Sequence, residues 1–159
     1  MRVALLTHQW PGIRMGGIGA AVRQTAAALA SAGHEVHLFT FEIPPDLAAS
    51  IPAGVHFHQV PSLAARVSNN TVNPILAATI DSAGEGAYRL ALASLLCESL
   101  RREHARTPFD IIEAPEVDAL TLPLLLKPDF TAPIITHLHC CTALANFANQ
   151  QVSTPSQSL

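Results

Sequence analysis

The chain has 159 residues, of which 49% are hydrophobic and only 13% are charged. This length suits one domain with a single core, and the apolar runs fall far short of the ~20 residues that span a bilayer, which excludes an integral membrane protein. A formal net charge of -3 and nine scattered Lys and Arg residues exclude an electrostatic surface for nucleic acid.

Cysteine usage and the N-terminus indicate the compartment. The chain has three cysteines, two of them the adjacent Cys140 and Cys141, where a disulfide would be strained. No apolar signal region follows Arg2. We therefore expect reduced thiols and a cytoplasmic location, with association with a membrane surface left open.

The first half of the chain predicts a strand, a helix and two further strands. Residues 3–7 (VALLT) form an apolar run typical of a buried parallel strand. Apolar residues then recur at helical spacing from Ile18 until Gly33, which suits the left-handed position after a helix. Residues 35–41 (EVHLFTF) and 55–60 (VHFHQV) are predicted as the second strand and a third strand at a sheet edge.

The second half alternates helices and strands again. Residues 62–84 have weak periodicity and predict a loop with a short helix, whereas residues 85–106 predict a long amphipathic helix. Strands are expected at residues 109–114 (FDIIEA) and 133–138 (PIITHL). A short helix with a proline bend is expected between them, at residues 118–126.

This order predicts an α/β fold, namely a Rossmann-like, doubly wound, mostly parallel sheet with flanking helices. Residues 1–148 are interpreted as one domain. Residues 149–159 lose apolar periodicity and are rich in Ser, Gln and Pro, so a disordered tail is expected there.

The stretch MGGIGAAV at residues 15–22 comes close to the dinucleotide-binding pattern G-x-G-x-x-G/A. Two details weigh against that reading: about eight residues separate the glycines from the first strand, and the sixth position is the bulky Val22. A P-loop is excluded because no Gly-Lys-Ser/Thr follows. Two readings stay open, a phosphate contact at a helix N-terminus and a tight entry into the helix.

Four stretches in register carry a family resemblance: RVALLTHQWPG, GGIG, ASAGHEVHLFT, and the pair FDIIEAPE and PIITHLH. Over roughly residues 2–140 the chain resembles the N-terminal domain of family 4 glycosyltransferases, which have the GT-B fold. The resemblance implies retaining transfer of a sugar from a nucleotide sugar to an acceptor. It implies no cofactor beyond that co-substrate and no metal.

The resemblance also implies roles for individual residues. The loop at Gly16, Gly17 and Ile18 would offer backbone amides to the donor phosphates across a cleft. His139 matches a histidine that the family keeps after a strand and that faces the donor sugar, which makes it the candidate catalytic residue. His137 lies two residues earlier and is expected on the same side of the strand.

The acceptor would bind near acidic residues at the carboxyl end of the sheet. Glu113 and Glu116 lie at the C-terminal end of the fourth predicted strand, and His8 follows the first. Glu116 is the better candidate of the two acids because it lies in the loop. A plain reading as a solvated loop acid or an ordinarily packed histidine stays open for each.

The segment HLHCC at residues 137–141 also raises a zinc site as an alternative. Strand alternation would send Cys140 to the face opposite His139, and no second ligand pair exists, so we expect no metal there.

The family's C-terminal, donor-binding domain and its E-x7-E pair of glutamates have no counterpart in these residues. We therefore expect a fragment that needs this domain or a partner chain, that is inactive alone, and whose acceptor is unknown. Two alternatives stay open: a stand-alone nucleotide- or anion-binding module or partner half, and an NAD-dependent oxidoreductase in which Glu42 would follow the second strand.

Overall fold

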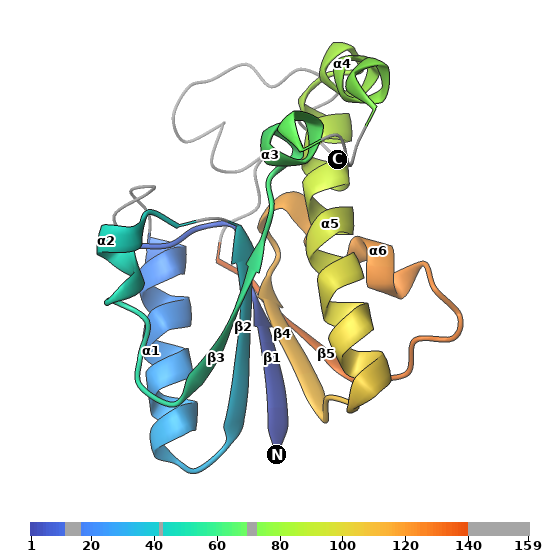
Figure 1. The fold of residues 1–159 in the computed structure, drawn as a ribbon. Helices are drawn as coiled ribbons and strands as arrows, with labels where there is room; N and C mark the ends of the chain where they lie inside the picture. The colour runs from blue at the N-terminus through green and yellow to red at the C-terminus, as the bar shows by residue number, and fades with distance from the viewer. Residues whose placement is uncertain (12–16, 42, 70–72, 140–159) are drawn as a thin grey trace.

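The computed structural model describes residues 1–11, 17–41, 43–69 and 73–139. Five parallel strands form one sheet in the order β3-β2-β1-β4-β5 (Figure 1). The strands are β1 (Arg2–Leu6), β2 (Glu35–Phe41), β3 (Val55–Val60), β4 (Ile111–Pro115) and β5 (Ile134–His137). The expected α/β architecture is confirmed, and β3 lies at an edge of the sheet as expected.

Helices cover both faces of the sheet. The α-helices are α1 (Gly17–Ser31), α2 (Pro45–Ala48), α3 (Leu63–Ser68), α4 (Pro74–Ser82), α5 (Glu85–Arg106) and α6 (Leu122–Leu125), with a 3-10 turn, η1 (Val117–Ala119), after β4. Helix α1 packs on one face, and α5 and α6 pack on the other (Figure 1). Because the connections after β1 and β4 run to opposite sides, the chain is doubly wound.

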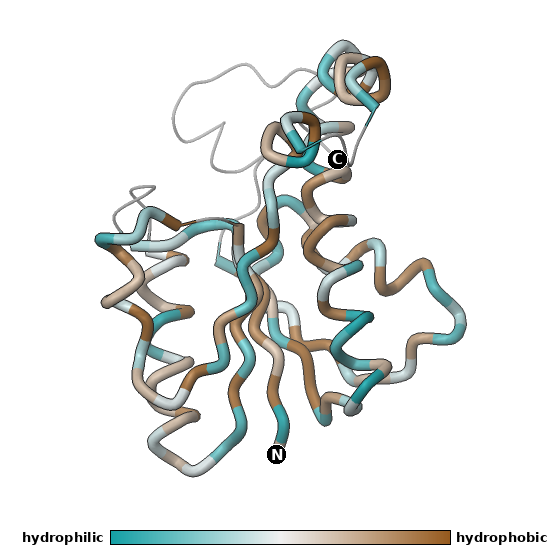
Figure 2. Tube along the Cα trace, in the orientation of Figure 1, coloured by the Kyte–Doolittle hydropathy of each residue, from teal (hydrophilic) through white to brown (hydrophobic). Residues whose placement is uncertain are grey.

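Hydrophobic residues run along the central strands (Figure 2), and all five residues of β1 are buried. Alternate side chains of β1 belong to two separate hydrophobic cores, one on each face of the sheet. Val3 and Leu5 pack with Val22 and Ala26 of α1, as the helical spacing predicts. Ala4 and Leu6 join the core under α5. Gly33 has φ of 81°, which confirms the left-handed position expected after α1.

Two segments differ from the sequence-based expectation. Residues 62–84 contain two helices, because Ser62 and Asn73 each cap a helix N-terminus through a side-chain oxygen. In α5 the buried face consists of Ala93, Leu96, Cys97 and Leu100, whereas Tyr88 and Leu90 near its N-terminal end are exposed.

The short helix expected at residues 118–126 is divided. Asp118 has φ of 61° and Ala119 has φ of 47°, so a continuous α-helix cannot run from η1 into α6. The expected tail at residues 149–159 lies outside the described residues.

Candidate functional site

The carboxyl ends of β1, β4 and β5 bring the predicted site residues to one edge of the sheet. His8 follows β1, Glu113 and Glu116 lie at the end of β4, and His137 and His139 lie at the end of β5. Strands β1 and β4 are neighbours whose connections leave in opposite directions, and ligands of open α/β sheets bind at such a switch point.

Helix α1 begins at this edge with Gly17. Its first-turn N–H groups have no partner within the helix and carry partial positive charge, which favours an anion. Gly17 is exposed, and a Cβ placed on it would meet no atom within 4 Å, so a ligand has room to approach the backbone. Ile18 is half-buried against the α1 core. Gly16, which begins the predicted phosphate loop, lies outside the described residues.

Gly19 serves packing instead. A Cβ on this residue would lie 3.1 Å from the backbone oxygen of Gln9 and 3.2 Å from the carbonyl carbon of Trp10. Gly19 therefore allows a close approach between the first turn of α1 and the loop that follows β1, one turn before Val22, which is itself buried in the core.

His137 and His139 line one small pocket with Glu113 and the first turns of α1. The pocket is a shallow hollow with a cavity volume of only about 20 Å³, and it is also lined by Ala21 and Thr25. The two imidazole centroids are 6.4 Å apart. His137 Nε2 lies 3.4 Å from Glu113 Oε1. The expectation that both histidines share one side is met, since both face this pocket.

Glu116 holds the end of β5 in place. Its backbone N–H donates to the carbonyl oxygen of His137 at 3.0 Å, and its Oε2 accepts from the backbone N–H of His139 at 2.9 Å. Sequence reasoning treated Glu116 as an acceptor ligand and missed this positioning role for the His139 backbone.

His8 is less accessible than the sequence suggested. Its side chain is 6% exposed, and Nε2 lies 3.1 Å from Asp118 Oδ2. The other oxygen of Asp118 accepts from Arg89 of α5 at 2.6 Å. Sequence reasoning missed this three-residue link because Arg89 and Asp118 are 29 positions apart and no local pattern joins them. In the structure, the positive φ of Asp118 marks this residue as one that its surroundings hold in an unusual backbone conformation.

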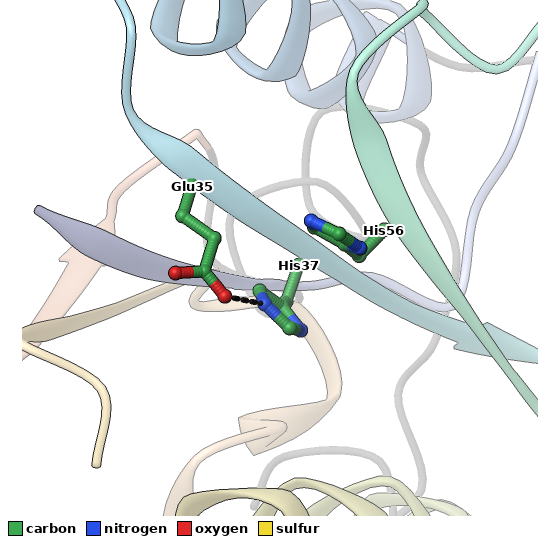
Figure 3. Close-up of side chains that lie close together, drawn as sticks. All are labelled: Glu35, His37 and His56. Carbon is green, nitrogen blue, oxygen red and sulfur yellow. Dashed lines mark hydrogen bonds and ion pairs between the residues drawn. The ribbon is translucent and has the colours of Figure 1, made fainter. Parts of the chain in front are cut away.

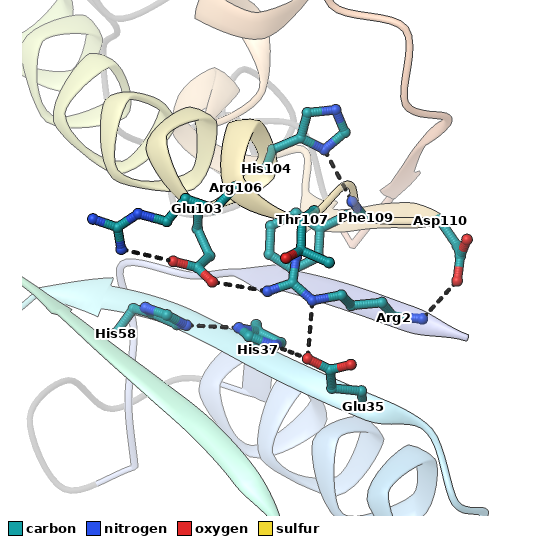
Figure 4. Close-up of polar contacts among 10 residues, drawn as sticks. All are labelled: Arg2, Glu35, His37, His58, Glu103, His104, Arg106, Thr107, Phe109 and Asp110. Atoms are coloured by element: carbon teal, nitrogen blue, oxygen red, sulfur yellow. Dashed lines mark hydrogen bonds and ion pairs between the residues drawn. The ribbon is translucent and has the colours of Figure 1, made fainter.

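A second polar cluster lies at the opposite end, under the C-terminal turns of α5 (Figure 4). Arg2 is 8% exposed and donates to Glu35 at 2.9 Å and Glu103 at 2.8 Å, and its guanidinium lies 4.2 Å from the ring centroid of Phe109. His37 links Glu35 to His58, through Nε2 at 2.9 Å and Nδ1 at 2.7 Å respectively.

These contacts shift the pKa values of the cluster. Hydrogen bonds from His37 and Arg2 lower the pKa of Glu35 to about 2. Burial lowers the pKa of both His37 and His58, so the imidazoles are neutral at pH 7. Sequence reasoning singled out none of these histidines; their alternation along two strands was the available signal.

Cysteine chemistry concerns three residues. Cys97 is buried in the core, its Sγ donates to the Leu120 carbonyl oxygen at 3.0 Å, and burial raises its pKa to about 12, so it is an inert thiol. Cys140 and Cys141, which raised the zinc alternative, lie outside the described residues, as does Glu42 of the oxidoreductase alternative. In the part of the chain that the structure describes, no helix is long and apolar enough to cross a membrane.

The fold and the edge site define a class, a doubly wound α/β domain with a ligand site at its topological switch point. The family model of the glycosyl transferase 4-like domain matches residues 16–158, so the chain belongs to this family of sugar-transferring enzymes. The family resemblance seen in the sequence is thereby confirmed.

Among solved structures, sucrose-phosphate synthase from Thermosynechococcus elongatus is similar, with a TM-score of 0.57 and 18% sequence identity. The match covers 98% of this chain and 36% of the synthase chain, and at this identity the likeness concerns the fold. No curated protein matches the chain.

Proposed function

We propose that the chain is the acceptor-side domain of a GT-B glycosyltransferase that transfers a sugar from a nucleotide sugar with retention of configuration. The observation that carries the proposal is the pocket in which His137, His139 and Glu113 face the first turns of α1. A sugar hydroxyl needs hydrogen-bonding side chains, and a diphosphate needs amides, and this edge of the sheet offers both.

The donor phosphates would lie at the N-terminus of α1. Negative charge grows on the nucleoside diphosphate as its bond to the anomeric carbon breaks, and fixed N–H groups at Gly17 and Ile18 stabilise that charge without reorganisation. In this proposal Gly16 completes the loop. The reaction needs no metal at this site.

His139 is the proposed catalytic residue. Its ring lines the pocket, and its backbone N–H donates to Glu116. This hydrogen bond fixes the backbone of His139, which positions the imidazole to contact the donor sugar. The acceptor oxygen bonds to the anomeric carbon as the bond from that carbon to the nucleoside diphosphate breaks, and the proton of the acceptor hydroxyl passes to the departing diphosphate.

The acceptor would lie beside Glu113 and Glu116, with His8 behind them. Helices α3 and α4 stand near this carboxyl edge, at the N-terminal end of α5 (Figure 1), and would border the acceptor. The buried His8 orients the edge through Asp118 rather than binding the acceptor directly.

We further propose that a donor-binding domain or partner chain completes the enzyme. The chain matches only 36% of the synthase, and the E-x7-E pair through which the family holds the donor is absent from these residues. The alternative function as an NAD-dependent oxidoreductase is less well supported. Ten residues separate β1 from α1, whereas a dinucleotide-binding fold has a tight turn there.

Nuclear magnetic resonance of the ¹⁵N-labelled chain tests the donor site with UDP-glucose and GDP-mannose as probes. We expect weak, saturable shifts at the amides of Gly17 and Ile18 and at His139. Gly17→Pro removes one amide at a helix position that tolerates proline, and Gly17→Ala adds a Cβ but keeps the amide. Binding should be several-fold weaker in Gly17→Pro than in Gly17→Ala.

Equal affinity in the two variants, or shifts that cluster away from α1, would contradict the proposal. Tight binding of UDP by the wild-type chain would instead favour a stand-alone nucleotide-binding module.

A further inference from the structure

Three side chains from the edge strand β3 and its neighbour β2 converge on one face of the sheet, away from the proposed transferase site. Glu35 and His37 are alternate residues of β2, and His56 of β3 is the register partner of His37. Because alternate residues of a strand share a face, all three point toward the same side (Figure 3). One ligand atom from each lies within 4.8 Å of the others.

We propose that Glu35, His37 and His56 bind one divalent zinc-type ion. Two imidazole nitrogens and a carboxylate oxygen form a ligand set that suits Zn²⁺, and a water molecule would complete the tetrahedron. His37 is buried and fixed in the sheet, whereas Glu35 and His56 are exposed, so an ion from solvent can reach the cluster.

The hydrogen bonds already present around His37 provide the outer contacts of such a site. His37 Nε2–H now donates to Glu35 Oε1 at 2.9 Å, and His37 Nδ1 accepts from His58. An ion between Nε2 and Oε1 takes the place of that proton, which leaves to solvent. The proton on His58 Nε2 passes to His37 Nδ1, and His58 Nδ1 takes a proton from solvent, so both rings stay neutral. Nδ1–H of His37 then donates to His58 Nε2, the kind of contact that orients a metal-bound histidine.

The local charge favours a cation in spite of Arg2. Glu35 and Glu103 flank the Arg2 guanidinium, Asp110 Oδ2 accepts from its backbone N–H, and Arg106 lies 3.4 Å from Glu103. Three carboxylates therefore face two guanidinium groups around neutral imidazoles. The N–H of Arg2 also fixes the Glu35 carboxylate, as outer contacts fix ligands in metal sites.

Binding requires one small movement. Metal–ligand bonds of about 2.1 Å place tetrahedral ligand atoms roughly 3.4 Å apart. The Glu35–His37 pair is at 2.9 Å, but the His56 ring now stacks on His37 with centroids 4.6 Å apart. Because His56 is exposed, rotation about its side-chain bonds can turn a nitrogen toward the ion.

Such an ion would link the edge strand β3 to β2. Glu35 opens β2 and His56 is the second residue of β3, so the ion lies near the amino ends of the strands, whereas the proposed transferase site lies at their carboxyl ends. The ion would stabilise the domain by binding the folded state, and it would take no part in sugar transfer.

Tag-free, metal-stripped full chain is titrated with Zn²⁺ by calorimetry and with Co²⁺ by absorption spectroscopy. We expect one ion per chain, a cobalt spectrum without a thiolate charge-transfer band, and a rise of the melting temperature with Zn²⁺. His56→Ala should weaken binding by about tenfold or more and abolish the thermal shift.

His34→Ala is the matched control, because His34 lies beside β2 but outside the cluster and its removal leaves the same number of histidines. It should bind as the wild type does. Three results would each overturn the proposal: no binding at millimolar metal, unchanged binding in His56→Ala, or a thiolate band that assigns the ion to cysteines.

Discussion

Gly17 and Gly19 of α1 have different surroundings, and an alanine substitution at each should change the stability of the fold differently. Gly17 faces open space, and its backbone has no positive φ, so alanine fits there. Gly19 presses against the backbone of Gln9 and Trp10, and Trp10 is buried, so these atoms have little room to move.

We expect Gly19→Ala to lower the free energy of unfolding by about 1–2 kcal/mol, because overpacking outweighs the gain in helix propensity. Gly17→Ala should leave it unchanged or raise it by up to about 1 kcal/mol through the unfolded state. Urea denaturation followed by circular dichroism measures both. A larger loss in Gly17→Ala than in Gly19→Ala would show that the close approach to Gln9 does not constrain the helix.

At the scale of elements, the C-terminal turns of α5 make stability depend on pH. His104 Nδ1 accepts from the backbone N–H of Phe109 at 3.0 Å. Burial, and next the charge of Arg2, lower the pKa of His104 below 6.5. Because the folded state holds its proton less tightly than the unfolded state, this contribution is complete above pH 6.5 and is lost as pH falls through the folded-state pKa.

His104→Asn keeps a side-chain oxygen that can accept from Phe109 but does not titrate. The melting temperature of the wild type should therefore fall more steeply from pH 7 to pH 5 than that of His104→Asn. Calorimetry at several pH values measures both melting temperatures. The other histidines and the carboxylates are common to the two proteins, so their contributions cancel in the difference. Parallel curves for the two proteins would exclude His104 as a source of the acid sensitivity.

Elements with strong local signals were predicted well, and those that depend on distant contacts were not. The bounds of β2, β3 and α5 agree with the sequence because turn residues flank clear patterns. At residues 62–84 the sequence predicted one short helix where α3 and α4 form two, although Ser62 and Asn73 carry capping signals, because the apolar periodicity there is weak.

The site shows the same division. The parallel topology predicts that the ends of β4 and β5 meet, and His139 and Glu113 do share a pocket. The bond from His139 N–H to Glu116, the link from Arg89 through Asp118 to His8, and the approach of His56 to Glu35 join residues of different elements. Such contacts depend on the register and spacing of packed elements, which one sequence does not encode in any local pattern.

At the scale of the whole molecule, large apolar side chains are exposed on α4, on α5 and on the last described elements. Leu125 and Leu126 of the α6 region and Ile135 and Leu138 of the β5 region are all exposed, Leu138 by 84%. Exposed apolar side chains of this kind are typical of a surface that contacts another domain or chain.

We therefore expect the 159-residue chain alone to transfer no sugar from labelled UDP- or GDP-sugars to candidate acceptors. In the proposed enzyme another domain supplies part of the donor contacts and excludes water, and without that domain the electrostatic stabilisation of the leaving diphosphate is weaker. Radiolabelled product analysis with and without a glycosyltransferase C-terminal domain that carries the E-x7-E pair makes the test, and His139→Ala serves as the control. Transfer should appear only in the combined sample and fall in His139→Ala, whereas clear turnover by the chain alone would show that these residues already form a complete active site.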